Sequence, residues 1–398
     1  MEINSLFNVL GRLSGIIALI SLALLIFSGD TARFFDRFFG FDRIIKFQRQ
    51  FSIFVASFVF LHPILFILAD SSILYFLIPR FYVLSLAFGV SALYIFVGVM
   101  LSSYFYKRIS YRAWQYIHLI TYFLLFLVLY HAFFWGPNAD KIIFQLIYLF
   151  IIAIVSVGAI YRLIYKMKLK RRPKFFVDKI IKDTEDTFSV KLRSTEKLKF
   201  VAGQFCFLRL DKEGLYARHP FTISSAPHEE SLMFTVKNTG KFTQALFEMK
   251  ENEELLIDGP FGRFTRKENA EDLIFIAGGV GITPFRSMSI DHIRNNRKGR
   301  IVLLYAAKKE ANLIFKQEFD SFQSDNFQAY YFLSAEEKNS GNFSPNRIDK
   351  NIIEEMIGKT KNPTFYICGP EPLKKAIISI LEELKIEKKS IIFEDFFW

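Results

Sequence analysis

Three histidines lie within the first 135 residues, inside stretches that are otherwise apolar. His62 belongs to one stretch, while His118 and His131 lie thirteen residues apart in another. An imidazole is costly to place in hydrocarbon unless it has a partner, and two opposed imidazoles are axial ligands that haem iron accepts. These residues therefore predict a membrane segment that binds haem.

The histidines must be positioned by apolar runs that are long enough to cross a hydrocarbon core of about 30 Å. Such runs cover residues 6–27, 44–68, 81–104, 114–134 and 142–165. The first run is too long for a usual signal peptide and contains Arg12, so we expect it to remain as a helix. The sequence predicts five membrane-spanning helices.

Charge is distributed unevenly along the 398 residues. Lys and Arg outnumber Asp and Glu by 17 to 6 up to residue 172, whereas the numbers after it are 34 and 33. Basic loops remain on the cytoplasmic side, so we expect a multi-pass protein of the cell membrane with its N-terminus outside and its C-terminal half in the cytoplasm. The positive charge indicates contact with membrane lipid and not with nucleic acid.

The predicted topology assigns a depth to each histidine. Spans two and four run in the same direction, which places His62 and His131 toward the outer leaflet and His118 toward the inner one. One haem between His62 and His131 follows. At about 1.5 Å per residue, His118 lies about 20 Å from His131, which leaves room for a second haem. A tilt or a local bulge of the fourth span must turn the side chains of His118 and His131 toward the same side of the helix.

The second span carries a further motif, in which Gln48-Arg49-Gln50-Phe51-Ser52 is followed by His62-Pro63. It resembles the His-Arg-x-Leu-Gly…His-Pro helix of the ferric reductase and NADPH oxidase transmembrane family. The resemblance implies that the inner-haem histidine of the family falls on Gln48, which is a poor iron ligand. Whether one or two b-type haems bind, the inner one through His118, stays open.

The composition changes after residue 172 to short β-rich runs, and from Leu273 to alternating strand and helix patterns. We therefore predict a multi-domain membrane protein. An all-α transmembrane bundle covers residues 1–170, a small β-barrel covers 173–268, and an α/β, Rossmann-like domain covers 269–398.

Residues His219 to Pro227 read His-Pro-Phe-Thr-Ile-Ser-Ser-Ala-Pro. They resemble the flavin motif of NADPH oxidases and of the ferredoxin-NADP reductase superfamily, which implies that the barrel binds FAD. We expect Phe221 against the isoalloxazine, Thr222 near flavin N5 and His219 near a phosphate. The other cofactor-binding residues of the motif are Pro220 and Ser225.

A second segment, from Lys237 to Thr243, resembles the pyrophosphate segment of the same superfamily. Gly240 permits close approach of the backbone, and a helix N-terminus follows it. This order of motifs favours FAD over FMN. Lys237, Gly240 and Thr243 are the expected contacts.

Two glycine-rich turns follow predicted strands. Ala-Gly-Gly-Val-Gly-Ile-Thr-Pro at 277–284 comes after a buried strand, an arrangement that seats a dinucleotide pyrophosphate. With Tyr-Ile-Cys-Gly-Pro at 366–370, it resembles the nicotinamide domain of the family, which implies that Thr283 and Cys368 border the nicotinamide. The expected nucleotide contacts are Gly278, Gly279, Gly281, Thr283, Pro284, Cys368, Gly369 and Pro370.

Two further positions bear on the cofactors. Lys308 occupies the place where the family reads the adenosine ribose, and a lysine lacks the bidentate fork of arginine, so any preference for NADPH over NADH is expected to be modest. Phe396, Phe397 and Trp398 resemble the closing aromatic residue that covers the flavin, and which of them stacks stays open.

The resemblances together imply a transmembrane NAD(P)H oxidase, in which electrons pass from cytosolic NAD(P)H through FAD and b-type haem to external dioxygen and yield superoxide. Thr222, Thr283 and Cys368 are the expected catalytic residues, acting by orientation. A transmembrane ferric or other metal reductase uses the same path. A membrane-tethered diaphorase or haem redox sensor, with the path interrupted at Gln48, is a third possibility. No obligatory protein partner is inferred.

Overall fold

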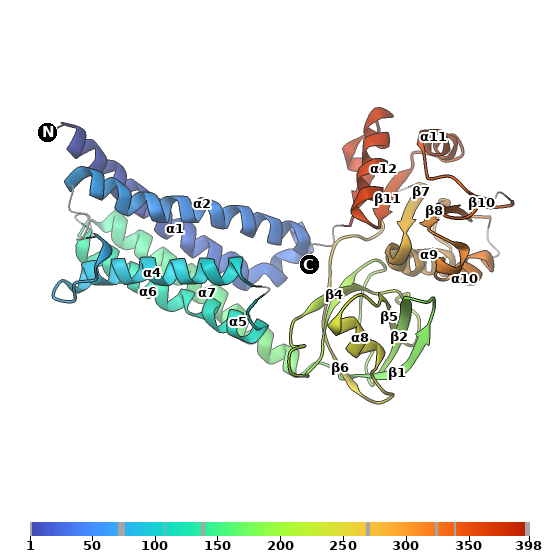
Figure 1. Cartoon of the computed structure of the whole chain (residues 1–398), viewed down its shortest axis with the longest axis horizontal. Helices are drawn as coiled ribbons and strands as arrows, with labels where there is room; N and C mark the ends of the chain where they lie inside the picture. Colours follow the sequence, from blue (N-terminus) through green and yellow to red (C-terminus); the bar gives the residue numbers. More distant parts are fainter. Residues whose placement is uncertain are drawn as a thin grey trace. The chain divides into compact units, whose positions relative to one another are not determined.

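The computed structural model describes residues 2–70, 76–106, 108–136, 140–267, 271–322, 325–337 and 340–394. The chain divides into two compact units, Met1–Arg171 and Arg172–Trp398. The first unit is helical, and the second contains two six-stranded sheets (Figure 1).

Helices in the first unit are α1 (Glu2–Phe39), α2 (Phe41–Asp70), α4 (Leu84–Tyr104), α5 (Tyr111–Leu119), α6 (Thr121–Trp135) and α7 (Ile142–Lys170). Within the described residues, five helical stretches are long and apolar enough to cross a membrane, with α5 and α6 counted as one. The predicted helical membrane part with five apolar helices is therefore confirmed.

α1 and α2 extend well beyond the predicted spans and are joined by a single residue, Gly40 (Figure 1). The predicted basic loop between the first two spans is therefore mostly helical. Gly40 has a φ of +85°, which glycine adopts easily because it lacks a Cβ. Its N–H donates to the carbonyl of Asp36 at 2.8 Å, which ends α1 and turns the chain into α2.

The fourth predicted span is interrupted at Ile120, between α5 and α6. His118 Nε2 lies 3.1 Å from Ser103 Oγ, and His131 Nδ1 lies 2.8 Å from the carbonyl oxygen of Ser85. Ser85 and Ser103 are eighteen residues apart on α4, which is about five helical turns, so both histidines face the same side of α4. The interruption at Ile120 is the local irregularity that this alignment requires.

Apolar side chains fill the interior of the helical unit and also cover its outside. The interior residues come from all five spans and include Leu19, Val55, Phe96, Leu124 and Ile151. Large apolar side chains on the outside include Ile53, Leu101, Phe126, Leu149 and Ile160. An outer surface of this kind is stable against lipid and unfavourable in water.

The first sheet of the second unit is antiparallel. Its strands are β1 (Phe175–Lys182), β2 (Thr187–Ser194), β3 (Phe205–Arg209), β4 (His219–Thr222), β5 (Leu232–Lys237) and β6 (Glu254–Phe261), in the order β4-β3-β6-β1-β2-β5. The helix α8 (Lys241–Phe247) follows β5. One isolated bridge between Ile223 and Phe234 joins the two ends of this order. The closed barrel stays a prediction, because one bridge is not a continuous ladder.

The second sheet is parallel throughout. Its strands are β7 (Leu273–Gly278), β8 (Ile301–Ala307), β9 (Phe327–Leu333), β10 (Phe343–Ser344), β11 (Thr364–Cys368) and β12 (Ile391–Phe393), in the order β10-β9-β8-β7-β11-β12. The helices are α9 (Thr283–Arg294), α10 (Lys316–Asp320), α11 (Lys350–Gly358) and α12 (Glu371–Glu383).

The core of the parallel sheet lies on both of its faces. Phe275 packs on one side with Phe285 of α9, and Ile274 packs on the other with Ile377 of α12. A strand buried on both faces is expected to be apolar throughout, as β7 is. The strand order reverses between β7 and β11, and a doubly wound sheet binds its ligand at the carboxyl ends of the strands at such a point.

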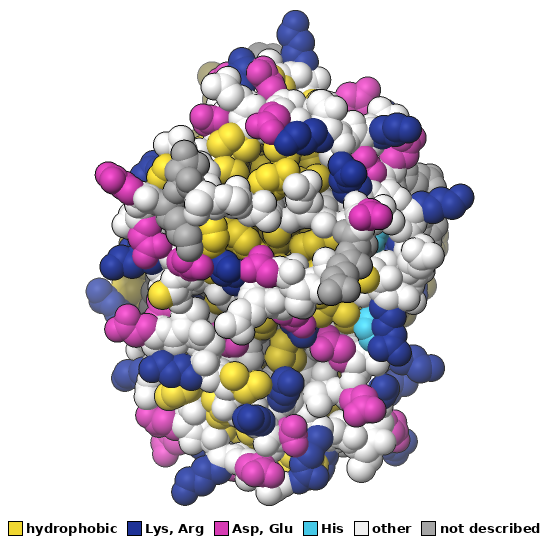
Figure 2. Space-filling model, turned by 90° about the vertical axis from the view of Figure 1, so that its right-hand side faces the viewer, with side chains coloured by type: hydrophobic (Ala, Val, Ile, Leu, Met, Phe, Trp, Pro, Cys, Tyr) yellow, Lys and Arg dark blue, Asp and Glu magenta, His cyan; other side chains and the backbone are white. Residues whose placement is uncertain are grey.

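Charged side chains of both signs are interspersed on the face of the molecule in Figure 2.

Candidate functional site

The two glycine-rich turns meet at the carboxyl ends of β7 and β11, where Ala277 lies opposite Cys368. A Cβ on Gly281 would lie 2.4 Å from the carbonyl oxygen of Cys368. A Cβ on Gly278 would lie 2.7 Å from a methyl group of Leu373. At Gly281 the Cβ would collide with the backbone, so only glycine fits there, whereas at Gly278 it would meet side-chain atoms of Leu373 and Pro370. The two predicted turns are therefore closely packed, and Gly369 lies at the same contact.

Gly279 has different surroundings, because a Cβ there would meet nothing within 4 Å, and its φ is +53°. Tyr305, which sequence reasoning missed, donates from its hydroxyl to the carbonyl of Gly279 at 3.1 Å. Burial raises the pKa of Tyr305, so this hydroxyl remains a donor. The turn is therefore held from β8 while its other side is open, which suits the approach of a dinucleotide.

Thr283 and Pro284 begin α9 directly after this turn. The hydroxyl of Thr283 donates to the carbonyl of Val280 at 3.1 Å, and the side chain is buried. Pro284 lies in the first turn of the helix, where its missing N–H leaves no intrahelical bond unmade. Both residues shape the turn.

The flavin motif and the pyrophosphate segment come together at Phe242 of α8. The ring of His219 lies 4.1 Å from the ring of Phe242, and Phe221 stacks on Phe242 at 6.0 Å and 16°. Burial lowers the pKa of His219, so its imidazole is neutral at pH 7. The structure thus brings together two motifs that are separated in the sequence.

Other residues of these motifs hold the protein together locally. Ser225 is 1% exposed, and its hydroxyl oxygen accepts the N–H of Met233 at 3.0 Å. Pro220 lies within β4 opposite Phe207. Lys237 pairs with Asp186 at 2.9 Å near the surface.

The start of α8 is closed by Thr243. Its hydroxyl oxygen accepts the N–H of Thr239 at 3.0 Å and that of Gly240 at 2.9 Å. A Cβ on Gly240 would meet nothing within 4 Å. As at Gly279, the backbone presents an open side, which fits the close approach that a dinucleotide needs.

The flavin motif and the nicotinamide turn meet at Glu394. Its Oε2 lies 3.5 Å from Thr222 Oγ1 and 3.6 Å from Cys368 Sγ. The parallel pairing of Phe393 with Ile367 carries Glu394 to this place. Burial, and then the Glu394 carboxylate, raise the pKa of Cys368 well above that of an ordinary thiol. A thiol with a raised pKa is a weak nucleophile, and the positioning role of Cys368 stays a prediction.

Arg286 of α9 connects the nicotinamide domain to the loop after the flavin motif. Its guanidinium lies 2.6 Å from both carboxylate oxygens of Glu318, 2.9 Å from Glu229, and donates to the carbonyl of Ser224 at 2.8 Å. Burial lowers the pKa of Arg286, but the hydrogen bonds to the two carboxylates raise it above its ordinary value. The arginine remains charged and fixes the spacing of the two domains.

Lys308 is the remaining predicted cofactor contact within the described residues. Lys308 is exposed at the end of β8, and its carbonyl accepts the N–H of Ala335 at 2.9 Å. Phe396, Phe397 and Trp398 lie outside the described residues, so their predicted stacking on the flavin is not tested.

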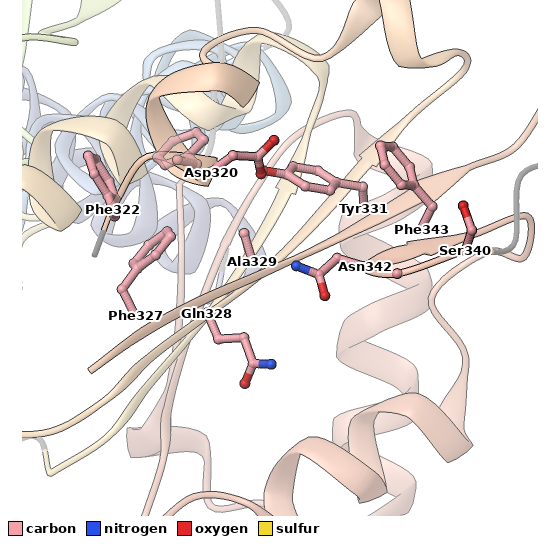
Figure 3. Close-up of a pocket in the computed structure, with 11 residues that line it drawn as sticks. Asp320, Phe322, Phe327, Gln328, Ala329, Tyr331, Ser340, Asn342 and Phe343 are labelled. Atoms are coloured by element: carbon pink, nitrogen blue, oxygen red, sulfur yellow. The ribbon is translucent and has the colours of Figure 1, made fainter. Parts of the chain in front are cut away.

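A separate cavity of about 490 Å³ lies between α10 and the strands β9 and β10 (Figure 3). Asp320 and Tyr331 line it, and the tyrosine hydroxyl donates to the carboxylate at 2.6 Å. The predicted cofactor residues are not among those that line this cavity.

In the helical unit, the rings of His62 and His131 face each other, with centroids 6.1 Å apart and planes at 83°. Their Nδ1 atoms lie 2.8 Å from the carbonyl oxygens of Gly11 and Ser85. A carbonyl oxygen only accepts, so each Nδ1 carries a proton, and in the neutral form of each ring Nε2 is the unprotonated nitrogen. This tautomer is the one that ligates a metal through Nε2.

The distance between the two rings can be compared with that of an axial pair. A metal lies about 2.0 Å from an imidazole nitrogen, which lies about 1.2 Å from its ring centroid, so centroids on opposite sides of one iron are about 6.4 Å apart. The observed 6.1 Å is close to this value. His62 and His131 are therefore the residues that would hold a haem iron.

His118 has different surroundings. Its Nε2 lies 3.1 Å from Ser103 Oγ, and its Nδ1 lies 2.9 Å from the carbonyl oxygen of Trp114. Gln48 donates to Ser28 Oγ at 3.4 Å. The other two histidines of this unit face each other, so the donor set around His118 does not fit a haem with two imidazole ligands. Among the residues described, no group of three or more His, Cys, Asp or Glu side chains could hold a metal ion.

A charged cluster inside the helical unit was missed by sequence reasoning. Asp30 of α1 is 5% exposed, accepts a hydrogen bond from the hydroxyl of Tyr122 of α6 at 2.6 Å, and pairs with Arg162 of α7 at 3.1 Å. A carboxylate inside a membrane helix requires such partners. The cluster ties three helices together.

Comparisons with known proteins match successive parts of the chain. The family models are a ferric reductase like transmembrane component over residues 14–129, an FAD-binding domain over 173–265, and an oxidoreductase NAD-binding domain over 275–378.

The relatives among the curated proteins match less than half of this chain. One of the subunits of the Na(+)-translocating NADH-quinone reductase of Pseudoalteromonas atlantica is 29% identical over 193 residues, which is 47% of this chain and 46% of the relative. Its counterpart in Shewanella denitrificans is 30% identical over 165 residues, 39% of this chain and 40% of the relative. The chain thus spans less than half the length of these relatives.

Solved structures show the fold of the second unit. A ferredoxin NADP+ reductase from Neisseria gonorrhoeae, with bound FAD and NADP, matches with a TM-score of 0.50 at 19% identity and covers 56% of this chain and 97% of its own. The FAD/NAD-binding domain of nitric oxide dioxygenase from Vibrio cholerae matches with the same TM-score at 21% identity, over 56% and 99%. The chain therefore carries, in order, a region similar to a ferric reductase like transmembrane component, a region similar to an FAD-binding domain and a region similar to an oxidoreductase NAD-binding domain, and its second unit has the fold of the gonococcal reductase.

Proposed function

We propose that this protein is a transmembrane NAD(P)H oxidase that reduces dioxygen on the outer side of the membrane and releases superoxide. In the balanced reaction, one NAD(P)H and two dioxygen molecules give NAD(P)+, two superoxide ions and one proton. FAD supplies the change from a two-electron donor to one-electron chemistry, and b-type haem supplies a one-electron carrier. The facing pair His62 and His131 is the observation that carries the proposal.

Hydride transfer from NAD(P)H to FAD requires that the nicotinamide ring and the flavin ring are held in a fixed orientation. Gly279 leaves room for the dinucleotide, and Glu394 contacts Thr222 and Cys368 at the junction of the flavin and nicotinamide motifs. Arg286 holds the two domains at a fixed spacing through its two carboxylate partners. Holding reactants in register lowers the barrier without acid or base catalysis.

The acceptor side uses the membrane helices. We propose one haem per chain, held by His62 and His131, because the surroundings of His118 and Gln48 do not offer a second pair of imidazoles. We place this site toward the outer leaflet and the dehydrogenase in the cytoplasm, from the distribution of Lys and Arg.

The nucleotide donor is proposed to be either NADPH or NADH. The curated relatives are components of an NADH-quinone reductase by name, whereas the gonococcal structure holds NADP. Lys308 offers a 2′-phosphate a single exposed charge, so we expect a modest preference.

Two alternatives rest on specific observations. The match of residues 14–129 to a ferric reductase like component favours a transmembrane reductase of ferric or other metal ions. The glutamine at position 48 favours a membrane-tethered diaphorase or haem redox sensor, in which electrons do not cross the membrane.

The deciding experiment uses the purified full chain, reconstituted with FAD and haem in lipid nanodiscs and supplied with NADPH or NADH. Cytochrome c reduction that superoxide dismutase abolishes supports the oxidase. Reduction of a ferric chelate under argon, without superoxide in air, supports the metal reductase. Dye reduction that persists in His62→Ala, without either product, supports the diaphorase. Activity of the chain alone also tests the inference that no protein partner is needed.

A further inference from the structure

We propose that Gly15 and Gly89 are positioning residues of the haem site, each shaping a recess on a neighbouring helix that fixes one axial imidazole. This inference rests on the proposed haem between His62 and His131. It concerns α1 and α4, which carry neither ligand.

Both imidazoles lie against these glycines. A Cβ on Gly15 would lie 2.6 Å from Nδ1 and 2.7 Å from Cε1 of His62. A Cβ on Gly89 would lie 2.6 Å from Nδ1 and 2.8 Å from Cε1 of His131. Real Cβ contacts essentially never fall below 3.0 Å. Any side chain at either position therefore displaces the ring that faces it.

The same arrangement is built twice, on two different helices. Each imidazole donates from Nδ1, at 2.8 Å, to the carbonyl of the residue four positions before its glycine, which is Gly11 on α1 and Ser85 on α4. In an α-helix this carbonyl already accepts the N–H of the glycine, and its second lone pair is free for another donor. The ring reaches that lone pair because the glycine above it has no side chain.

The hydrogen bond decides where Nε2 points. It fixes the tautomer and the plane of each ring, as partners of metal-bound histidines generally do. An added Cβ would force the ring to retreat by at least 0.4 Å, from 2.6 Å to 3.0 Å. Metal–ligand distances vary by only about 0.2 Å, so this retreat is larger than the iron bond tolerates.

Glycines in membrane helices also serve a different purpose, since they allow two helix backbones to approach closely. At Gly15 and Gly89 the nearest atoms to the added Cβ are all imidazole atoms of a histidine, and none is backbone. The missing side chain therefore makes room for the imidazole ring and not for the backbone of a neighbouring helix.

The test compares Gly15→Ala and Gly89→Ala with Gly29→Ala on α1 and Gly98→Ala on α4. In both controls a Cβ meets nothing within 4 Å. Haem per chain is measured by pyridine haemochrome, and haem affinity by titration of the haem-free, full-length protein. We expect about 10- to 100-fold weaker haem binding in the first pair and no change in the controls. Equal haem affinity in all four variants would overturn the proposal.

A second measurement does not depend on haem. The melting temperature of the haem-free chain is compared for Gly15→Ala alone and in the His62→Ala background. We expect Gly15→Ala to lower the melting temperature only when His62 is present. An equal loss in both backgrounds would assign Gly15 to helix packing and overturn the proposal.

Failure of the inference can be distinguished from failure of the proposed function. A wild-type chain that binds no haem contradicts the function, whereas the coupling between Gly15 and His62 is measured without haem. FAD content and NAD(P)H-dependent ferricyanide reduction show in every variant that the second unit is folded.

Discussion

His62 and His131 face each other with ring centroids 6.1 Å apart, yet each imidazole is hydrogen-bonded to the main chain of a third and a fourth helix. The gap between the rings is therefore set by four helices, α1, α2, α4 and α6. Neither ring depends on the other for its hydrogen bond, so each imidazole is oriented by the main chain of a neighbouring helix.

His62→Ala and His131→Ala are each expected to abolish haem binding, because each removes one of the two axial nitrogens. His118→Ala is expected to retain one haem per chain, since His118 contacts Ser103 and Trp114 and no other imidazole. Pyridine haemochrome and the Soret band measure both outcomes. Loss of haem in His118→Ala to the same extent would show that the haem is held elsewhere.

Gln48→His is expected to raise the haem content from one toward two per chain, because it supplies an imidazole where the resemblance places the inner ligand. In the wild type the amide of Gln48 contacts Ser28 Oγ at 3.4 Å. The matched control is Gln50→His on the same helix. A haem content of one in both variants would contradict the placement of the inner site.

Glu394→Gln is expected to slow reduction of the flavin by NAD(P)H by at least about tenfold, or about 1.4 kcal/mol of barrier. The carboxylate contacts Thr222 and Cys368, and the amide changes the charge at this junction while it retains the size. Stopped-flow absorbance of the flavin gives the rate. FAD content should stay at the wild-type level, and Glu387→Gln, at an exposed position, should leave the rate unchanged.

Arg286→Ala is expected to lower the free energy of unfolding of the second unit by about 1–3 kcal/mol, because two carboxylates lose their cation but remain partly in water. Burial raises the pKa of Glu229, but its hydrogen bond to Arg286 lowers it below the ordinary value. The ion pair between Arg286 and Glu229 therefore adds to the free energy of unfolding above about pH 4.3. This contribution is lost as the pH falls through the pKa that Glu229 has in the folded protein.

Urea unfolding of the second unit as a function of pH tests this expectation. The wild type should lose stability steeply in acid, and Arg286→Ala should show a flatter profile. Arg297→Ala, which removes a more exposed arginine paired with Asp291, is the control and should keep the wild-type profile. An acid profile of Arg286→Ala identical to that of the wild type would exclude the ion pair as its source.

Sequence reasoning predicted the elements that depend only on residues close together in the chain. Five apolar runs of membrane length are helical in the described residues, because the length and the composition of a segment decide whether it can span. The turn at Gly278 and Gly279 was predicted because turns of this kind need glycine, and it lies where expected, beside Cys368.

The features that were missed depend on partners far away in the chain. Glu394 reaches Thr222 only through the pairing of a three-residue strand, β12, with β11. The interruption at Ile120 is invisible in a uniformly apolar run. The recess at Gly15 depends on His62, 47 residues later in the sequence, and no local pattern marks such a pair.

The pair of Asp30 and Arg162 bears on how the protein is made. Asp30 lies on the first membrane helix and its cation on the last, 132 residues later. Chains emerge from the ribosome N-terminus first, so the aspartate is synthesised before its cationic partner exists. The ion pair that ties the first helix to the fifth can therefore form only after the fifth helix has been synthesised.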